Sequence, residues 1–247
     1  MLYYSLVCRL ITLETRNLTV KLNGYNILEN INLRINGPGL YFILGRNGSG
    51  KSTLLRALAG LLPYRGEVLI NGREIRNYKR KELSKIVGYV WQNPFYGFFE
   101  STVEREIRFI LKNINSEGRF EELIDYFGIK KFLKRSPFTL SGGEAKRVCI
   151  CSVLVADQQI YLLDEPEGEL DYKGLEKLVR FVETESKRKL IVVATHNTLL
   201  AHKLRESVEK ILIIHNGKIV GEFGPEILVN KEFLINVGIV PVYWWLE

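Results

Sequence analysis

The chain has 247 residues, a formal net charge of +7 and 46% hydrophobic residues, which suits one large globular domain or one domain with a subdomain. Cys8, Cys149 and Cys151 are too few and too irregularly spaced for a disulfide framework or a zinc site, so we expect reduced, intracellular thiols. No apolar run reaches the about 18 residues of a membrane helix, and Arg9 interrupts the N-terminal segment, which argues against a signal peptide. Any membrane role is therefore expected to run through a partner.

The first third of the chain predicts strands around one glycine-rich loop. Apolar residues alternate in 10–20 and 27–35, which predicts short strands. The apolar run "GLYFILG" (39–45) predicts a strand that enters the loop, and "KSTLLRALAGLL" (51–62) has the apolar spacing of a helix. Asn71-Gly72 lies between two β-prone runs and predicts a hairpin.

The middle of the chain predicts helices. Residues 103–134 are charged and have helical periodicity, with breaks near Asn115–Gly118 and at Gly128, and Ser136-Pro137 ends this region. We expect 103–135 to form a helical subdomain inserted in the remaining fold. A further helix is expected after the Ser-Gly-Gly of "LSGGEAKRVCICSVLVA" (140–156).

The last third alternates strands and helices. Continuously apolar runs in 159–165 and 190–196 predict buried strands, with a helix in 175–188 between them. Asn216-Gly217 predicts a second hairpin. Apolar strands that alternate with helices predict an α/β fold whose parallel sheet is covered on both faces.

A phosphate-binding loop follows the strand of residues 39–44. The pattern G-x4-G-K-[ST] is matched by Gly45-Arg46-Asn47-Gly48-Ser49-Gly50-Lys51-Ser52. Glycines let successive main-chain N–H groups turn toward an anion, and the following helix adds its positive end. Lys51 is expected to reach the β- and γ-phosphates and the Ser52 hydroxyl to ligate Mg²⁺. The flanking strand and helix disfavour the alternative of a glycine-rich structural turn.

Asp164-Glu165 ends the apolar run 160–163. The last residues of such a strand lie at the sheet edge where ligands gather, beside the phosphate loop. Asp164 is therefore expected to hold Mg²⁺ directly or through water, as in a Walker B arrangement, which leaves Glu165 free to polarise an attacking water. An isolated Asp-Glu pair would more simply be a solvated strand end.

The segment "LSGGE" (140–144) offers a second candidate anion site, because a serine and two glycines open a helix. On these residues alone, an equally good interpretation is that Ser141 caps the helix and the glycines permit the turn. A GTPase is disfavoured because the guanine-reading Asn-Lys-x-Asp is absent, and a kinase would need a substrate-binding lid.

Six segments together resemble the ATP-binding cassette (ABC) ATPases: "GRNGSGKST", "WQNP", "LSGGEAKR", "YLLDEP", "ELD" and "ATH". They follow the family's order and approximate spacing from about residue 12 to 225. The resemblance implies a P-loop NTPase core with a mainly parallel sheet, an N-terminal antiparallel β subdomain and an inserted α-helical subdomain of about 95–145. It further implies one ABC ATPase domain over 1–247, with a C-terminal extension at about 225–247.

The resemblance also implies a role for individual residues. Catalysis is expected to use Glu165, His196, Lys51 and Gln92, with His196 as the switch that contacts the γ-phosphate. Mg²⁺ is expected at Ser52, Gln92 and Asp164. ATP is expected at the loop residues and at Tyr25: Gly45, Arg46, Asn47, Gly48, Ser49, Gly50, Lys51, Ser52, Thr53 and Tyr25. Taken singly, Gln92 would be a surface glutamine and His196 a satisfied polar residue at a strand end.

In the family, two chains pack head-to-tail, and each ATP lies between one phosphate loop and the opposing "LSGG" helix start. The expected partner is therefore a second ABC ATPase chain, identical or different. The residues expected to meet the partner's ATP are Ser141, Gly142, Gly143, Glu144 and Asp171, with Asp171 coupling the two halves.

The sequence departs from the family's pattern at three places. Counting places Leu22 where the family stacks adenine on an aromatic ring, and the nearby Tyr25 is the candidate substitute. The usual small residues between Glu165 and Asp171 are replaced by Glu167–Glu169, which adds acid beside the loop that couples the sites. Glu144 replaces a glutamine.

"QNP" with Phe99, Thr102, Val103 and Glu106 resembles the energy-coupling factor or cobalt/nickel importer ATPases, and 224–241 resembles their C-terminal extension. The acidic residues and glutamine usual after "QNP" are here "FYG" (95–97).

Four aromatic residues follow Gln92: Phe95, Tyr96, Phe98 and Phe99. Either they bind a cytoplasmic helix of a membrane subunit, or they pack locally under the helical subdomain. The tail "VPVYWWLE" (240–247) is either a strap on the core or a dimer contact.

We therefore expect the ATP-hydrolysing subunit of a membrane transporter, an importer of the energy-coupling type, peripheral at the cytoplasmic face and bound to an integral membrane subunit. It is not expected to contact the cargo. The alternative is a soluble, non-transport ABC ATPase that acts on nucleic acid or ribosomes, which the single cassette disfavours. A non-enzymatic cassette is disfavoured because Glu165 and His196 are both present.

Overall fold

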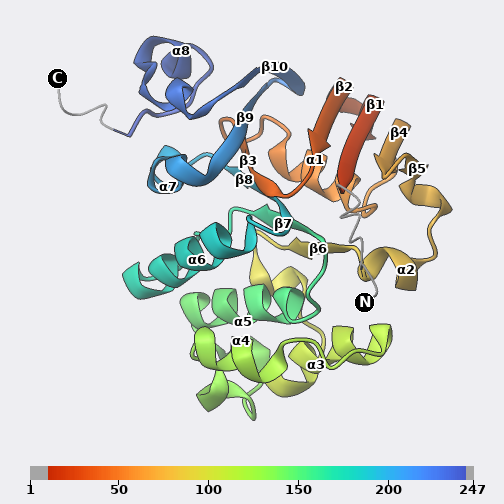
Figure 1. Cartoon of the computed structure of the whole chain (residues 1–247), viewed down its shortest axis with the longest axis vertical. Coiled ribbons are helices and arrows are strands. Elements are labelled where there is room, and N and C mark those ends of the chain that lie inside the picture. Colours follow the sequence, from red (N-terminus) through yellow and green to blue (C-terminus); the bar gives the residue numbers. More distant parts are fainter. Residues whose placement is uncertain (1–10, 243–247) are drawn as a thin grey trace, which may run out of the picture.

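The computed structural model of the chain describes residues 11–242, and its centre is a six-stranded sheet (Figure 1). The strand order is β10-β9-β3-β8-β7-β6. Every neighbouring pair is parallel except β9 and β10, which pair antiparallel. The strands are β3 (Gly39–Leu44), β6 (Val87–Val90), β7 (Ile160–Asp164), β8 (Leu190–Thr195), β9 (Val208–His215) and β10 (Lys218–Phe223). The mainly parallel sheet predicted from the sequence is thereby confirmed.

A second, antiparallel sheet lies beside the first, in the order β2-β1-β4-β5. Its strands are β1 (Thr12–Leu22), β2 (Tyr25–Asn36), β4 (Arg65–Ile70) and β5 (Arg73–Glu74). Both predicted Asn-Gly hairpins form, because Asn71-Gly72 and Asn216-Gly217 all have positive φ, as a tight hairpin turn requires. A third such turn, Asn23-Gly24, joins β1 to β2.

Helix α1 (Lys51–Leu58) packs between the two sheets. Strand β3 shows how the core is divided into two clusters. Its residues are all buried, and they alternate between the two faces of the central sheet. Tyr41 and Ile43 join the cluster that holds α1 and the antiparallel sheet, whereas Leu40, Phe42 and Leu44 join the cluster on the helical side. A strand covered on both faces is therefore continuously apolar.

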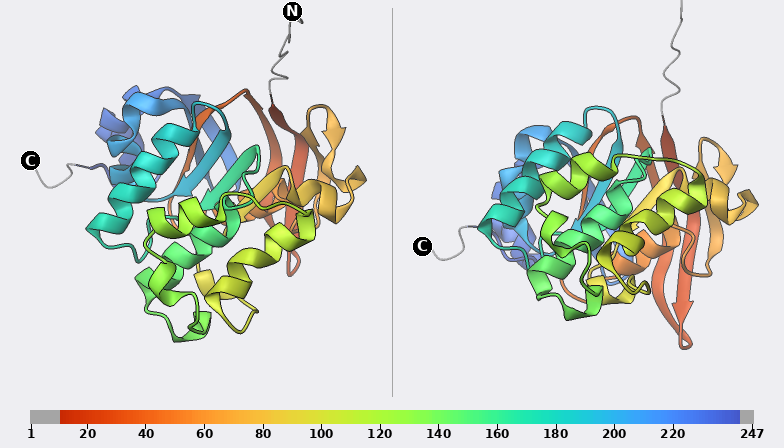
Figure 2. Two further views of the ribbon diagram at one scale, coloured as in Figure 1. Left: turned by 60° about the horizontal axis from the view of Figure 1, so that its bottom comes forward. Right: turned by 90° about the horizontal axis from the view of Figure 1, so that it is seen from below.

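The helical subdomain covers the other face of the central sheet (Figure 2). It contains α3 (Val103–Ile114), α4 (Phe120–Tyr126) and α5 (Gly142–Leu154), with short 3-10 turns at Lys130–Phe132 and Pro137–Thr139. The predicted breaks are correct, because α3 ends at Ile114, before Asn115 with φ 56°, and α4 ends at Tyr126, before Gly128 with φ 67°. The segment 127–141 between α4 and α5 carries only the two short turns.

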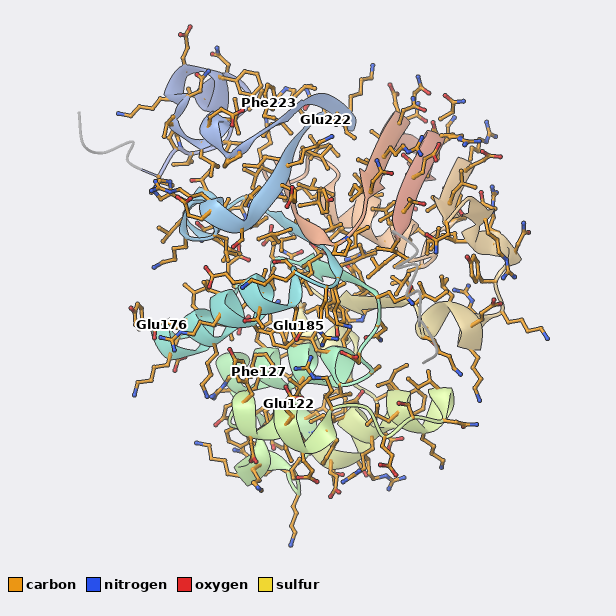
Figure 3. The ribbon with its side chains drawn as sticks, in the orientation of Figure 1. Glu122, Phe127, Glu176, Glu185, Glu222 and Phe223 are labelled. Atoms are coloured by element: carbon orange, nitrogen blue, oxygen red, sulfur yellow. The ribbon has the colours of Figure 1, made fainter. Side chains whose placement is uncertain are left out.

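A charged cluster ties this subdomain to α6 (Tyr172–Glu185). Arg119, next to α4, donates to Glu185 Oε1 over 2.8 Å, and Arg188 lies 2.6 Å from Glu185 Oε2. Phe127 and Phe181 pack beside it with their ring centroids 5.8 Å apart. Figure 3 shows Glu185 at the end of α6, Glu122 on α4 and Phe127 directly after α4, in the region where the two helices approach.

The C-terminal part of the described chain packs on the core rather than extending from it. Ile227, Leu228, Leu234 and Ile239 all belong to the buried cluster on the helical side. This part contains α7 (Thr198–Lys203), α8 (Lys231–Asn236) and 3-10 turns at Arg205–Ser207 and Pro225–Val229. The remaining short elements are α2 (Arg80–Ser84) and 3-10 turns at Ile75–Asn77 and Pro94–Tyr96. Most of the aromatic tail, 243–247, lies outside the described residues, as does Cys8.

Cys149 and Cys151 are free and buried in α5. Within residues 11–242, the structure has no helix that combines the length and the apolar character of a membrane span.

Candidate functional site

Four strands of the central sheet end at one edge, and each is followed by a residue singled out from the sequence. The loop after β3 leads to Lys51, and β7 ends at Asp164. His196 follows β8, and Gln92 lies two residues beyond the end of β6. The carboxyl ends of parallel strands form the place where ligands bind in open α/β sheets. These residues lie together at this edge as predicted. Lys51, Gln92 and His196 contact Glu165, and Asp164 contacts Ser52 in the first turn of the helix after the glycine loop.

The glycine loop closes tightly around the Lys51 ammonium. Nζ of Lys51 donates to the carbonyl oxygens of Gly45, over 2.9 Å, and Arg46, over 3.1 Å. A Cβ added to Gly45 would lie 2.5 Å from both Ile214 O and Ser49 Oγ, so only glycine fits there. Gly50, which precedes α1, has φ 108°, a conformation that L residues avoid.

Two observations show that the loop suits a phosphate group. The Ser49 hydroxyl is buried and has no hydrogen-bond partner among the described residues. The first N–H groups of α1 also lack partners within the helix, as at every helix start. A phosphate supplies several acceptor oxygens and negative charge at such a place. Arg46 and Asn47 are exposed, whereas Ser52 and Thr53 are half-buried in the first turn of α1.

Ser52 and Asp164 form the candidate magnesium site. The Ser52 hydroxyl donates to Asp164 Oδ1 over 2.9 Å, and the Tyr89 hydroxyl donates to Oδ2 over 2.8 Å. Asp164 is fully buried, which raises the pKa of its carboxyl, while the two hydrogen bonds act in the opposite direction. A hydroxyl beside an oriented carboxylate fits Mg²⁺, which takes oxygen ligands and is commonly held by one or two protein carboxylates plus phosphates.

No group of three or more His, Cys, Asp and Glu side chains arranged to hold a metal occurs in residues 11–242. Sequence reasoning missed Tyr89, which lies on β6 three residues before Gln92. The only available signal is that a tyrosine in a buried strand needs a partner for its hydroxyl.

Glu165 lies at the centre of the site. Its Oε2 accepts a hydrogen bond from Gln92 Nε2 over 2.9 Å, and its Oε1 lies 2.9 Å from His196 Nδ1. Lys51 Nζ is 3.8 Å from Oε1. Both carboxylate oxygens of Glu165 therefore contact neighbouring side chains, and its expected part in polarising an attacking water stays a prediction.

Burial lowers the pKa of Lys51, whereas the carboxylates of Glu165, Asp164 and Glu167 raise it. The ammonium is thus surrounded by carboxylates on one side and by loop carbonyls on the other. Such a cation is placed to receive a further anion at the mouth of the loop.

The start of α5 carries a capping box, which confirms the structural interpretation of Ser141. Its hydroxyl accepts from Glu144 N over 3.4 Å, and Glu144 Oε2 accepts from Ser141 N over 3.0 Å. The capping box leaves the N–H groups of Gly142 and Gly143 without intrahelical partners. The alternative interpretation as an anion site therefore also stays open.

The acidic segment Glu167–Glu169 packs against this helix start. A Cβ on Gly142 would lie 1.6 Å from Glu169 Oε2, and one on Gly143 would lie 2.8 Å from the Glu169 carbonyl oxygen. Glu169 itself has φ 63°. Asp171 caps α6, because its Oδ1 accepts from Gly174 N over 2.7 Å. Its expected part in coupling two chains stays a prediction.

Tyr25 begins β2 with its side chain 75% exposed. Among the described residues, no hydrogen bond or ring contact joins it to the glycine loop, so its contact with adenine stays a prediction.

The four aromatic residues after Gln92 do not behave alike. Phe98 is 7% exposed and packs edge-on against Phe95 and Phe138, with centroid distances of 5.9 and 6.4 Å. Local packing is therefore correct for Phe98. The others are exposed, and together with two residues of the helical subdomain they form what we call the aromatic patch: Phe95, Tyr96, Phe99, Phe109 and Phe138.

The chain is similar to proteins of known family. The family model described as "ABC transporter" matches residues 28–168. The chain is 37% identical over 218 residues to the energy-coupling factor transporter ATP-binding protein EcfA of Methanoculleus marisnigri, which covers 85% of this chain and 78% of that protein. It is 36% identical over 215 residues to an ABC transporter ATP-binding protein of Clostridium tetani; the match covers 85% of this chain and spans about half, 48%, of that protein.

Among solved structures, the chain resembles cbiO1 from Clostridium perfringens, described as part of the ABC transporter complex cbiONQ. The TM-score is 0.70 at 28% identity, and the match covers 91% of this chain and 93% of cbiO1.

Proposed function

Because the chain belongs to the ABC transporter family, an ATPase family, we propose that it is the ATP-hydrolysing subunit of an energy-coupling-factor-type importer. The similarity to EcfA and to cbiO1 supports the subfamily. The observation that carries the proposal is the meeting of Lys51, Gln92 and His196 around Glu165 at the mouth of the glycine loop.

Each side chain has a part in hydrolysis. Lys51 binds the β- and γ-phosphates, and the loop N–H groups surround them. Ser52 and Asp164 would hold Mg²⁺, with Gln92 as a further ligand, and the bound ion would offset the negative charge that the phosphates develop. Glu165 orients and deprotonates the attacking water, which requires that its oxygens exchange Gln92 and His196 for that water. His196 then donates toward the γ-phosphate.

The site is half of a composite site. The N–H groups of Gly142 and Gly143 at the start of α5 have no partners within the helix. Lys51 binds the phosphates at the chain's own glycine loop, so these N–H groups are left for a second nucleotide. We propose that a second chain, identical or different, brings its ATP to Ser141, Gly142, Gly143, Glu144 and Asp171. ATP then closes the dimer and hydrolysis releases it.

A membrane subunit binds where the Gln92 segment meets the helical subdomain. A groove of about 370 Å³ is lined by Leu61, Arg80, Trp91 and Ile110, among others. The aromatic patch follows Gln92 directly and exposes rings of the kind that are enriched at protein interfaces. We propose that a cytoplasmic helix of an integral membrane subunit fills this region, which places the chain at the cytoplasmic face of the membrane without contact to the cargo.

Glu165→Gln tests the proposal. The variant keeps the side-chain shape but cannot take a proton, so ATP turnover should fall by about 10²- to 10⁴-fold while the ATP-bound dimer accumulates. Light scattering after size exclusion with ATP and Mg²⁺ measures the dimer. Glu117→Gln, at an exposed carboxylate of the helical subdomain, is the matched control and should behave as wild type. A monomeric Glu165→Gln protein with unchanged hydrolysis would contradict the sandwich mechanism.

A further inference from the structure

Lys146 on α5 is a fully buried lysine, with no exposed surface. Its ammonium donates to two main-chain carbonyl oxygens, Trp91 O over 3.1 Å and Gln92 O over 2.8 Å. An ammonium carries three donors, and a buried cation is costly unless these donors are used. Lys146 therefore joins the helix that begins with the Gly142–Gly143 pair to the segment that carries Gln92.

A buried carboxyl group faces the same region. Glu167 Oε1 accepts a hydrogen bond from the Thr195 hydroxyl, which in turn accepts from Asn197 N over 2.9 Å. The second oxygen, Oε2, is buried without a hydrogen-bond partner in residues 11–242. Burial raises the pKa of Glu167, and its hydrogen bond with Thr195 and the positive charge of Lys146 act against that shift.

The charges around Lys146 come from several elements. Burial lowers its pKa, whereas Cys149 on α5 and the carboxylates Glu167, Asp164 and Glu165 after β7 raise it. The ammonium itself contacts the backbone that carries Gln92. No other cation is in direct contact with the Gln92 main chain among the described residues.

The Lys146 hydrogen bonds affect how far Gln92 lies from Glu165. The Gln92 amide reaches Glu165 Oε2 over 2.9 Å, and the main chain behind that amide is held by Lys146. A shift of α5 therefore moves Gln92 relative to Glu165, and the structure contains the hydrogen bonds that transmit it.

We propose that Lys146 is a positioning residue for hydrolysis: it fixes the Gln92 segment to α5 and so holds Gln92 at the strand edge that carries Glu165. This inference deepens the proposed function and rests on it. Lys146 touches neither the nucleotide loop nor the reacting atoms, so its effect runs through Gln92.

Three variants separate positioning from general stability. Lys146→Met keeps the length of the side chain but leaves the Trp91 and Gln92 carbonyls without donors. Lys146→Gln restores two N–H donors on a neutral side chain. Lys189→Met is the matched control, because Lys189 is also buried and its ammonium also donates to two main-chain carbonyls, those of Asp157 and Gln158, away from the site.

The first readout is ATP hydrolysis by the full chain. Lys146→Met should lower kcat by about tenfold or more, as for the loss of one well-placed interaction in the transition state, and leave the KM for ATP unchanged. Lys146→Gln should recover most of kcat. Lys189→Met should lower the melting temperature without changing kcat of the folded protein. Wild-type kcat in Lys146→Met, or an equal loss in Lys189→Met, would overturn the proposal.

The second readout needs no hydrolysis. The chain has three tryptophans, so Trp244→Phe and Trp245→Phe together leave Trp91 as the only tryptophan, whose fluorescence can be followed selectively. In this background Lys146→Met should increase acrylamide quenching of Trp91, whereas Lys146→Gln and Lys189→Met should not. Unchanged quenching would overturn the anchoring contact, and a wild-type chain that binds but never hydrolyses ATP would instead overturn the proposed function.

Should Lys146→Met fail to fold, Lys146→Leu replaces it. This variant also leaves the Trp91 and Gln92 carbonyls without the ammonium donors. A lower kcat at unchanged KM, with higher quenching of Trp91, is the expected result. Wild-type values for kcat and quenching would overturn the proposal.

Discussion

Glu165 Oε1 lies 2.9 Å from His196 Nδ1, across the ends of two neighbouring strands. The Glu165 N–H donates to the Ala194 carbonyl over 2.8 Å, so a main-chain bond fixes the register in which the two side chains meet. This contact sets the orientation of a carboxylate and an imidazole that we propose to act on the same phosphate.

His196→Ala should therefore retain ATP binding but lower turnover by about 10²-fold or more, the usual size of a lost acid–base or positioning group. The measurement pairs nucleotide affinity, from a fluorescent ATP analogue, with steady-state hydrolysis. His202→Ala, on α7 outside the site, serves as the control. A His196→Ala protein with wild-type kcat would show that the contact is structural only.

The aromatic patch gives a prediction about the membrane partner. Replacing Tyr96, Phe99 and Phe109 by serine removes three exposed rings, so ATP binding should persist while co-purification with a co-expressed membrane subunit is lost. Phe98→Ala is the contrasting variant: it empties a buried site, and should cost about 3–5 kcal/mol of stability. If the triple variant still co-purified like wild type, the patch would not be the interface.

The strand ends of this site are predictable from the sequence because each functional residue follows a continuously apolar run. Asp164 and His196 come directly after such runs, and a parallel sheet brings their carboxyl ends to one edge. The glycine loop is equally predictable, since its φ values and close approaches admit only glycine at Gly45 and Gly50. These features depend on local patterns.

Tyr89, Lys146 and Phe98 could not be placed in the same way. Lys146 binds carbonyl oxygens 54 and 55 residues away in the chain, and main-chain acceptors leave no mark in a residue pattern. Phe98 packs against Phe138 from a distant segment, so the residues around Phe98 in the sequence do not indicate that it is buried. The contacts of Glu165 come from two other strand ends, so the residues around it in the sequence do not indicate them.

Gly142 and Gly143 allow a test of how the acidic segment packs on α5. A Cβ at Gly142 meets the mobile end of the Glu169 side chain, whereas a Cβ at Gly143 meets the Glu169 main chain. Gly143→Ala should therefore lose about 1–3 kcal/mol of unfolding free energy, measured in urea, and Gly142→Ala less. Adding Glu169→Ala should rescue Gly142→Ala but not Gly143→Ala. Equal losses that no change at Glu169 relieves would contradict the packing.

Glu106 on α3 accepts hydrogen bonds from the main chain at Phe99, a residue of the aromatic patch, and at Glu100. It is 5% exposed, and its Oε2 accepts from Phe99 N over 2.9 Å and from Glu100 N over 2.8 Å. Burial raises the pKa of this carboxyl above its ordinary value of 4.5; the two main-chain hydrogen bonds act against the shift, and the charge of Glu100 adds to it.

A raised pKa in the folded state gives the pH dependence a definite sign. Below the ordinary value of 4.5, Glu106 is protonated in both states; as pH rises from there through its folded pKa, the unfolded chain ionises first and stability is lost. Glu106→Gln accepts the same hydrogen bonds without ionising, so the unfolding free energy of wild type minus that of the variant should fall across this window and then stay constant. Urea unfolding at a series of pH values measures the difference, with Glu117→Gln as the control that should run parallel to wild type. A difference that rises with pH would mean that the carboxylate, not the acid, is the form the fold stabilises.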